Sequence, residues 1–262
     1  MSNDAVDFDA ATARAIDRTY QTPDIVHQRL RVLDTLCLAP GEAVVDIGAG
    51  TGLMAHEMGH LVGPAGQVAG VDRSAAMLHV AAERCADLAQ VRFDVGDACA
   101  LPLPDGSMDA AVSMQVHEYV PDTEAALAEI FRVLKPGGRL SILDTAWDSV
   151  VWASDNPALT TRILKTWERH CPHPNLPLVL GPKLRAAGFR VGRAEVIPIF
   201  SPRYTDHSYA ASMMFMIARY CVDKDGLTQE DVDGWLAGQM AVAARGDWFF
   251  SLNRYVFTAV KP

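Results

Sequence analysis

The residues best suited to chemistry lie around a glycine-rich segment. An apolar run, 43–47, contains Asp46 and is followed by the segment 48–52, which has glycine at every second position. Twenty residues after this segment, a second apolar run ends in Asp72. Glycine adopts backbone angles that other residues avoid and lets the chain approach a ligand closely. A carboxylate at the tip of the second strand can accept hydrogen bonds from both hydroxyls of a ribose, so this order predicts the start of an α/β nucleotide-binding unit.

The spacing of the glycines favours one kind of nucleotide ligand over another. The segment reads Gly48-x-Gly50-x-Gly52, and Leu53 stands where a dinucleotide fingerprint has its third glycine. The loop therefore suits a nucleoside without a pyrophosphate better than it suits NAD. A nicotinamide-dependent oxidoreductase on a similar fold is kept as an alternative hypothesis.

Four motifs that occur in order resemble those of a known family. They are the glycine loop 48–52, Asp72, Gly96-Asp97-Ala98 and Leu134-Lys135-Pro136-Gly137-Gly138. Together they resemble the class I S-adenosylmethionine-dependent methyltransferases, most of all the small-molecule branch (methyltransferase type 11) that includes the ubiquinone/menaquinone methyltransferases. The resemblance covers about residues 20 to 145. It implies an α/β fold with a Rossmann-like, seven-stranded, mostly parallel sheet, helices on both faces, and S-adenosyl-L-methionine as the cofactor.

The resemblance also implies which positions contact the cofactor. The glycine loop would pack against the methionine and ribose portions, and Asp46 would lie near the methionine end. Asp72 would hold the ribose hydroxyls, while Asp97 and the Ala98 amide would face the adenine. The full set expected to bind the cofactor is Tyr20, Asp46, Gly48, Ala49, Gly50, Gly52, Asp72, Arg73, Met77, Asp97, Ala98 and Gln115.

Candidates for the catalytic groups follow the fourth and fifth expected strands. Relatives often carry His-His before Pro-Asp after the fourth strand, whereas this chain has Glu118 and Tyr119 in those places and His117 before them. This departure weakens a histidine-base mechanism. Asp144 ends the fifth strand, where an acid assists some sugar and phenol O-methyltransferases. Asp144, Glu118 and His117 are therefore the three candidates, each with a structural role as the alternative.

The expected elements alternate between strands and helices, which predicts a parallel sheet with helices on both faces. The expected strands are 44–47, 68–71, 91–95, 108–114, 139–143, 191–200 and 249–260, and the expected helices include 23–38, 53–61, 75–88, 122–134, 147–170 and 181–187. We expect a single methyltransferase domain, 1–262, whose core is formed by about 23–145, 188–200 and 249–262. Its helical cap, from insertions after the fifth strand and between the sixth and seventh, is expected in about 1–22, 147–187 and 201–248.

The composition of the expected cap suggests the kind of acceptor. Methionine and aromatic residues are concentrated between Tyr209 and Tyr220, and tryptophan occurs at position 147. Methionine adapts to varied shapes, so Trp147, Tyr209 and Met213 are expected to contact a fairly apolar or aromatic small molecule. The alternative is that these residues only form the core of the cap.

Overall composition narrows the partners. The 262 residues are half hydrophobic and carry a net charge of −9, which argues against a nucleic-acid substrate because such a substrate calls for a basic face. Five scattered cysteines without a Cys-x-x-Cys motif predict reduced thiols in a cytoplasmic protein, with neither a metal site nor disulfides. The longest apolar stretch, 210–222, contains Arg219 and is too short to cross a membrane.

Several functional questions stay open at this stage. The first hypothesis is a small-molecule methyltransferase of secondary metabolism or quinone-like chemistry, and an alternative is a non-catalytic S-adenosylmethionine-binding protein. A methyltransferase of macromolecules is disfavoured because the fourth strand ends in Ser-Met-Gln-Val and lacks an Asn-Pro-Pro-Tyr type of motif. The sequence does not decide whether O, N or C is methylated, and it leaves a homodimer open.

Overall fold

A seven-stranded sheet forms the centre of the protein in the computed structural model, which describes residues 10–262. The strand order is β3-β2-β1-β4-β5-β7-β6. Only β7 runs antiparallel, to both β5 and β6, and the other pairings within the sheet are parallel. The strands are β1 Ala43–Ile47, β2 Gln67–Asp72, β3 Val91–Val95, β4 Met108–Met114, β5 Leu134–Trp152, β6 Arg190–Ser201 and β7 Phe250–Val260. The predicted mostly parallel, seven-stranded architecture is thus confirmed.

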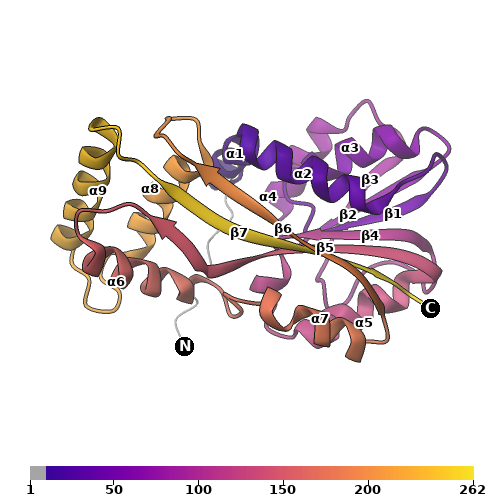
Figure 1. Ribbon diagram of the computed structural model, residues 1–262. Helices are drawn as coiled ribbons and strands as arrows, with labels where there is room; N and C mark the ends of the chain where they lie inside the picture. Colours follow the sequence, from indigo (N-terminus) through magenta and orange to yellow (C-terminus); the bar gives the residue numbers. More distant parts are fainter. Residues whose placement is uncertain (1–9) are drawn as a thin grey trace.

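Helices cover both faces of the sheet (Figure 1). The helices are α1 Ala10–Thr19, α2 Pro23–Leu36, α3 Leu53–Val62, α4 Ala75–Arg84, α5 Thr123–Val133, α6 Pro157–Trp167, α7 Pro177–Ala186, α8 Tyr209–Cys221 and α9 Gln229–Ala244, with 3-10 turns η1 His117–Tyr119 and η2 Glu168–His170. The side chains of Ser74 and Asp122 accept hydrogen bonds from backbone amides at the starts of α4 and α5, as expected of N-caps. In the described part of the chain, no helix is long and apolar enough to cross a membrane.

The strands are apolar on both sides because two helical layers bury them. Val44, on β1, packs in one layer with residues of α2 and α3, and its neighbour Val45 packs in the other layer with residues of α5 and α7. Successive side chains of a strand point to opposite faces, so β1 reads as a continuous apolar run interrupted only by Asp46. This polar exception lies next to the glycine loop.

A third apolar cluster lies beyond the carboxyl ends of the parallel strands, where Figure 1 shows α6, α8 and α9 around the extended ends of β5 and β7. We call these three helices the cap. The Trp152 ring makes edge-to-face contacts with Trp235, Trp248 and Phe250 at centroid distances of 5.5, 5.6 and 4.8 Å. The insertions therefore place helices over this end of the sheet, as expected.

The predicted boundary between core and cap is wrong in two places. The segment 147–152 is strand, not helix: β5 continues past a bulge, and Val151 and Trp152 pair with Ser251 and Phe250 of β7. The antiparallel partner supplies backbone hydrogen bonds that local sequence cannot reveal. Helix α7 belongs to the core, since Leu180 and Leu184 pack in the same layer as α5. Residues 1–9 of the predicted cap lie outside the described residues.

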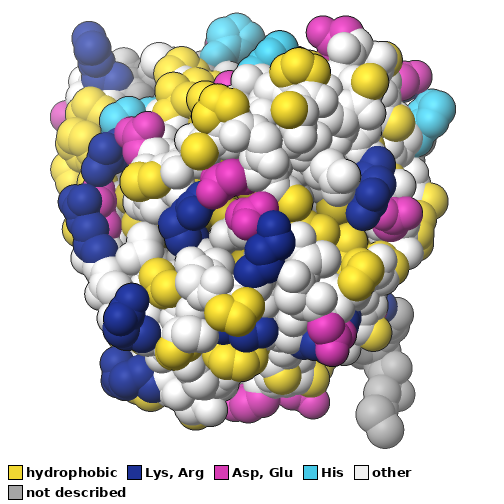
Figure 2. Space-filling view, turned by 90° about the vertical axis from the view of Figure 1, so that its right-hand side faces the viewer, with side chains coloured by type: hydrophobic (Ala, Val, Ile, Leu, Met, Phe, Trp, Pro, Cys, Tyr) yellow, Lys and Arg dark blue, Asp and Glu magenta, His cyan; other side chains and the backbone are white. Residues whose placement is uncertain are grey.

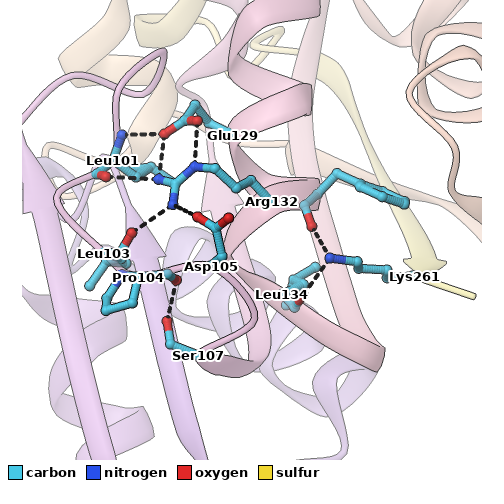
Figure 3. Close-up of polar contacts among 10 residues, drawn as sticks. Leu101, Leu103, Pro104, Asp105, Ser107, Glu129, Arg132, Leu134 and Lys261 are labelled. Carbon is cyan, nitrogen blue, oxygen red and sulfur yellow. Dashed lines mark hydrogen bonds and ion pairs between the residues drawn. The ribbon is translucent and has the colours of Figure 1, made fainter.

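Ion pairs fix the loop that follows β3. Figure 3 shows Arg132 of α5 donating to the carbonyl oxygens of Leu101 and Leu103 and to the carboxylates of Asp105 and Glu129. Glu129 in turn accepts from the Leu101 amide at 2.8 Å. This loop begins with Asp97 and Ala98, and α5 fixes the part of the loop that follows them, from Leu101 to Asp105.

The opposite end of the sheet, which faces the viewer in Figure 2, carries basic and acidic side chains side by side. Lys135 pairs with Asp109 at 2.7 Å and Arg139 with Glu42 at 2.6 Å, on strands and loops at this end. Because the charges alternate there, this face has no extended basic stripe of the kind that binds nucleic acid.

Candidate active site

The glycine loop turns sharply at the carboxyl end of β1. Gly48, Gly50 and Gly52 have φ angles of +71°, +52° and +77°, in the region that favours glycine. A Cβ atom at Gly48 would lie 2.1 Å from a methyl carbon of Val116, and one at Gly52 would lie 2.8 Å from the Ala81 Cβ. For a Cβ atom added at Gly50, by contrast, the nearest atom would be the Gly48 carbonyl oxygen, 3.9 Å away. The loop is therefore packed against protein at Gly48 and Gly52 and open at Gly50.

Asp72 joins this loop to α4. One carboxylate oxygen accepts a hydrogen bond from the Gly50 amide at 2.9 Å, and the other accepts from the Ser74 amide at 2.9 Å. An ionised carboxylate has about four acceptor positions, and the residue is only partly buried. Asp72 can thus shape the loop and still accept hydrogen bonds from two ligand hydroxyls.

Asp46 is a buried acid without a cationic partner. Its side chain is on β1, only 3% of the residue is exposed, and Oδ2 has no hydrogen-bond partner within residues 10–262. Burial, and then repulsion by Asp72, raise the pKa of Asp46 to about 7, although a hydrogen bond from the Ala55 backbone opposes this. A positively charged ligand at this position would relieve the cost of ionising Asp46.

The expected adenine side lies at the ends of β2 and β3. Asp97 is exposed, accepts from the Cys99 amide at 2.8 Å, and lies 3.8 Å from the Nε atom of Arg73. Ala98 is buried beside it. Met77 is 95% buried in α4, which is the arrangement expected of a helix core residue as well as of an adenine contact.

Gln115 and Tyr20 lie together at the mouth of β4. Gln115 has a positive φ of +57°, and its amide donates to the Leu143 carbonyl at 2.7 Å. Its Oε1 atom is buried with no partner among the described residues. Burial raises the pKa of Tyr20, while Arg254 and a hydrogen bond with Gln115 act in the opposite direction. The N-terminal segment therefore reaches the mouth of β4.

Helix α1 is fastened to the glycine loop by a contact that sequence reasoning missed. Asp17 accepts hydrogen bonds from the Thr51 hydroxyl at 2.7 Å and from Arg84 at 2.6 Å. Arg84 also donates to the Thr51 carbonyl at 2.9 Å. The side chains of Asp17 and Arg84 are only 16% and 23% exposed. We call these three residues the latch, because they join α1, the loop and α4.

Two of the three candidate catalytic groups form a buried acid pair. Glu118 and Asp144 are both 0% exposed. Burial raises the pKa of Glu118 to about 7, and burial together with repulsion by Glu118 raises the pKa of Asp144 well above its ordinary value. Their Oε1 and Oδ2 atoms have no hydrogen-bond partner in the part of the chain that the structure describes. Both groups can therefore hold or accept a proton near neutral pH.

His117 is the weakest of the three as a base. Its Nδ1 atom lies 2.9 Å from the Ser113 hydroxyl, and the ring is completely buried. Burial lowers the pKa of His117 to about 4, so the ring is neutral at pH 7 and binds a proton poorly.

Sequence reasoning missed Arg254 and Gln28, which meet the acid pair from the other side. Arg254 lies on β7, is 0% exposed, and donates to the Gln28 side chain at 2.6 Å and to the Tyr209 hydroxyl. Its guanidinium carbon is 4.6 Å from the centre of the Tyr209 ring. The alternation of side chains along the strand could have identified Arg254. Position 254 falls on the buried face of β7, between the apolar residues Leu252 and Val256.

The three predicted acceptor contacts are buried and packed. Trp147 contacts the rings of Trp167 and His170 at 5.6 and 4.9 Å, and Met213 lies in the same cap cluster. The Trp147 side chain is also close enough to Glu118 to lower the pKa of that acid, against the larger effect of burial. Cap packing is thus directly continuous with the acid pair.

Comparison with known proteins agrees with this geometry. Residues 45–142 match the family described as methyltransferase domain. A 2-phytyl-1,4-naphtoquinone methyltransferase of Synechococcus elongatus is 44% identical over 108 residues, which are 40% of this chain and 46% of that protein. This chain therefore spans less than half the length of that relative.

Solved structures extend the similarity to nearly the whole chain. The [4+2]-cyclase SpnF has a TM-score of 0.60 and 26% identity, over 90% of this chain and 80% of that one. A phosphoethanolamine N-methyltransferase of Haemonchus contortus, solved with S-adenosylhomocysteine, has a TM-score of 0.63 and 24% identity, over 97% of this chain and 57% of that one, and shares the fold. Residues 45–142 thus match a methyltransferase domain, and the seven-stranded fold around them is shared with solved methyltransferases.

Proposed function

We propose that this protein is an S-adenosylmethionine-dependent methyltransferase whose acceptor is a small, aromatic or apolar metabolite. The observation that carries the proposal is the pair Asp46 and Asp72 beside the open glycine loop. Asp72 can accept hydrogen bonds from ribose hydroxyls, and a cation beside the buried Asp46 would favour its ionised form. A nucleoside that carries positive charge meets both requirements, whereas the pyrophosphate of a dinucleotide would place negative charge near these acids.

The residues present fit S-adenosylmethionine at each of its parts. Asp72 would hold the ribose, Asp97 and Ala98 the adenine, and Asp46 with Gln115 the charged methionine end. When bound, this cofactor supplies an electrophilic methyl group. The chain's own groups bind and orient the two reactants, exclude water, and take a proton from the acceptor where one must leave.

The acid pair is the proposed proton acceptor. Glu118 has a pKa near the working pH, which suits a general base, and Asp144 lies beside it. His117 is kept as a third candidate by position only, because it is neutral and weakly basic. Trp147, Tyr209 and Met213 are proposed to contact the acceptor, since the first two adjoin the acid pair and Arg254.

We propose a single domain with a cap, a cytoplasmic location, and a role in secondary metabolism. The five cysteines are free, which supports a reducing compartment. The net charge of −9 supports a small acceptor over nucleic acid, and homodimer formation is left open.

A second candidate is a protein that binds the same cofactor without transferring its methyl group. It is favoured by the similarity to a [4+2]-cyclase at 26% identity. One experiment separates the candidates: calorimetry with S-adenosylhomocysteine and with NADH, followed by incubation with cofactor carrying an isotopically labelled methyl group and a set of phenols, quinols and amines. We expect binding of S-adenosylhomocysteine and mass-labelled product. Binding without labelled product from any acceptor favours the second candidate, and binding of NADH alone overturns both.

A further inference from the structure

Arg254 is a buried cation that has no anionic partner among the described residues. None of its surface is exposed, yet among the described residues no carboxylate oxygen lies within 4.0 Å of its guanidinium nitrogens. Charged groups are almost never fully buried unless they are paired, because removing a charge from water is costly. A guanidinium in this position therefore points to a counter-charge that residues 10–262 do not provide.

The groups that Arg254 does contact are neutral. Nη1 donates to the amide oxygen of Gln28 and Nη2 to the hydroxyl of Tyr209, and burial raises the pKa of Tyr209, which keeps it protonated. Its Nε atom has no hydrogen-bond partner in the described structure. These contacts hold the guanidinium in one orientation without neutralising it.

The neighbouring acids do not supply a full counter-charge either. Arg254 lies close enough to lower the pKa of both Glu118 and Asp144, but in each case burial has the larger, opposite effect. With a pKa of about 7, Glu118 is only partly ionised at neutral pH, so it compensates the guanidinium only in part. The nearest acid is thus placed to receive a proton, and the arginine is placed to hold a negative charge.

Several buried polar atoms near the Arg254 guanidinium have no hydrogen-bond partner among the described residues. Thr145 pairs with Arg254 across β5 and β7, and its Oγ1 atom is buried without a partner within residues 10–262. The same holds for Oε1 of Glu118, Nε1 of Trp147 and Nε2 of Gln28. The side chains of Thr145 and Trp147 lie close enough to Glu118 to lower its pKa as hydrogen-bond donors. Buried polar atoms are nearly always satisfied, so Nε2 of Gln28 and Nε of Arg254 are the atoms here that point to a ligand position.

We propose that Arg254 determines acceptor specificity by binding the acceptor as an oxyanion, and that the acceptor is therefore a phenol or an enol. This inference rests on the proposed function. Glu118 receives the proton of the acceptor hydroxyl, and Arg254 holds the oxygen that becomes negative. Nη1 and Nη2 each keep a second N–H besides the one they donate to Gln28 and Tyr209, and Nε is unpaired among the described residues, so donors remain for the acceptor oxygen. An amine acceptor gains nothing from a buried cation.

A chromogenic phenol tests the proposal without turnover. The protein is saturated with S-adenosylhomocysteine and titrated with 4-nitrophenol, which changes colour when it ionises. We expect the bound phenol to ionise at least about one pH unit below the free one, which is about a tenfold stabilisation of the oxyanion. The methyl ether 4-nitroanisole and the amine 4-nitroaniline, which have similar size and no acidic hydroxyl, should bind at least about tenfold more weakly.

Variants identify the group responsible. Arg254→Met should abolish the shift in ionisation, and Arg254→Lys, which keeps the charge, should retain part of it. Arg190→Met, at an exposed position on the neighbouring strand β6, is the matched control and should behave like the unchanged protein. Thermal unfolding shows whether each variant is folded. If Arg254→Met does not fold, the comparison of the three nitro compounds on the unchanged protein still decides the matter.

The outcomes separate this inference from the proposed function. Equal binding of 4-nitrophenol and 4-nitroanisole, or an unchanged shift in folded Arg254→Met, overturns the role of Arg254 while binding of S-adenosylhomocysteine stands. Absence of S-adenosylhomocysteine binding in the unchanged, folded protein overturns the proposed function itself.

Discussion

The carboxyl groups of Glu118 and Asp144 each accept a hydrogen bond from the backbone where the other residue lies, at the carboxyl ends of β4 and β5. The Asp144 Oδ1 atom accepts from the Glu118 amide at 3.4 Å, and the Glu118 Oε2 atom accepts from the Thr145 amide at 3.0 Å. One oxygen of each acid therefore fixes the ends of β4 and β5 relative to each other. The second oxygen of each is buried and unclaimed by any described residue, which leaves it free for a ligand.

The acid pair predicts that stability falls as the pH rises. The pKa of Glu118 in the folded protein, about 7, is raised from its ordinary 4.5, so the folded state binds this proton more tightly than the unfolded state does. Stability is therefore greatest below about pH 4.5 with respect to this group, and on the order of 3 kcal/mol is lost by about pH 7. Urea unfolding at a series of pH values measures this loss. Glu118→Gln should reduce the slope of the free energy of unfolding against pH. A variant that keeps the full slope contradicts the assignment.

Asp46 predicts that cofactor binding releases a proton. Its pKa of about 7 leaves much of it protonated at neutral pH, and a cationic ligand beside it favours the ionised form. Calorimetric titration with S-adenosylhomocysteine at pH 7 in two buffers of different ionisation enthalpy should give different heats. In Asp46→Asn this difference should disappear. Equal heats for the unchanged protein in both buffers would count against a cation at Asp46.

Asp72→Asn should weaken cofactor binding on the order of 10- to 100-fold, because an amide loses the negative charge and one of the acceptors that hold Gly50 and Ser74. Binding of S-adenosylhomocysteine by calorimetry measures the effect. Asp87→Asn, an exposed acid after α4, is the control and should bind normally. Equal affinity in the two variants would remove Asp72 from the site.

Gly48→Ala should destabilise the protein by several kcal/mol, because its Cβ would overlap Val116 at 2.1 Å in addition to the backbone strain. Gly106→Ala has a similar φ of +56° and no atom within 4 Å of the new Cβ, so it should cost only about 1 kcal/mol. Adding Val116→Ala to Gly48→Ala should recover part of the loss in urea unfolding. No recovery would show that the overlap is not the cause.

The latch predicts an effect on affinity without a large effect on the fold. Asp17→Asn removes the charge that holds Thr51 and Arg84 and should weaken S-adenosylhomocysteine binding several-fold, mainly through faster dissociation, because α1 is no longer fixed to the loop. Stopped-flow fluorescence measures the dissociation rate. Asp34→Asn, at an exposed acid of α2, serves for comparison. An unchanged dissociation rate in Asp17→Asn refutes this role.

Local patterns predicted the elements around the glycine loop. The glycine loop, β2 up to Asp72 and the N-cap Ser74 depend on neighbours only a few residues away, so their sequence spacing was sufficient. The segment 147–152 was predicted wrongly as helix because its strand depends on β7, about a hundred residues later in the chain. Asp17 was missed for a similar reason, since its partners come from the loop and α4.

The sequence by itself indicated the resemblance to a methyltransferase family, the succession of strands along the chain and the acids at the tips of the first two strands, because those features lie in short segments with characteristic spacing and apolar runs. The tertiary structure decided which distant groups share one buried volume. Only folding brings Gln28, Glu118 and Arg254 together, and only burial gives Glu118 a pKa near 7 and leaves Arg254 without a counter-charge. The cost of desolvating a charge depends on every atom around it, and no local stretch of sequence contains that information.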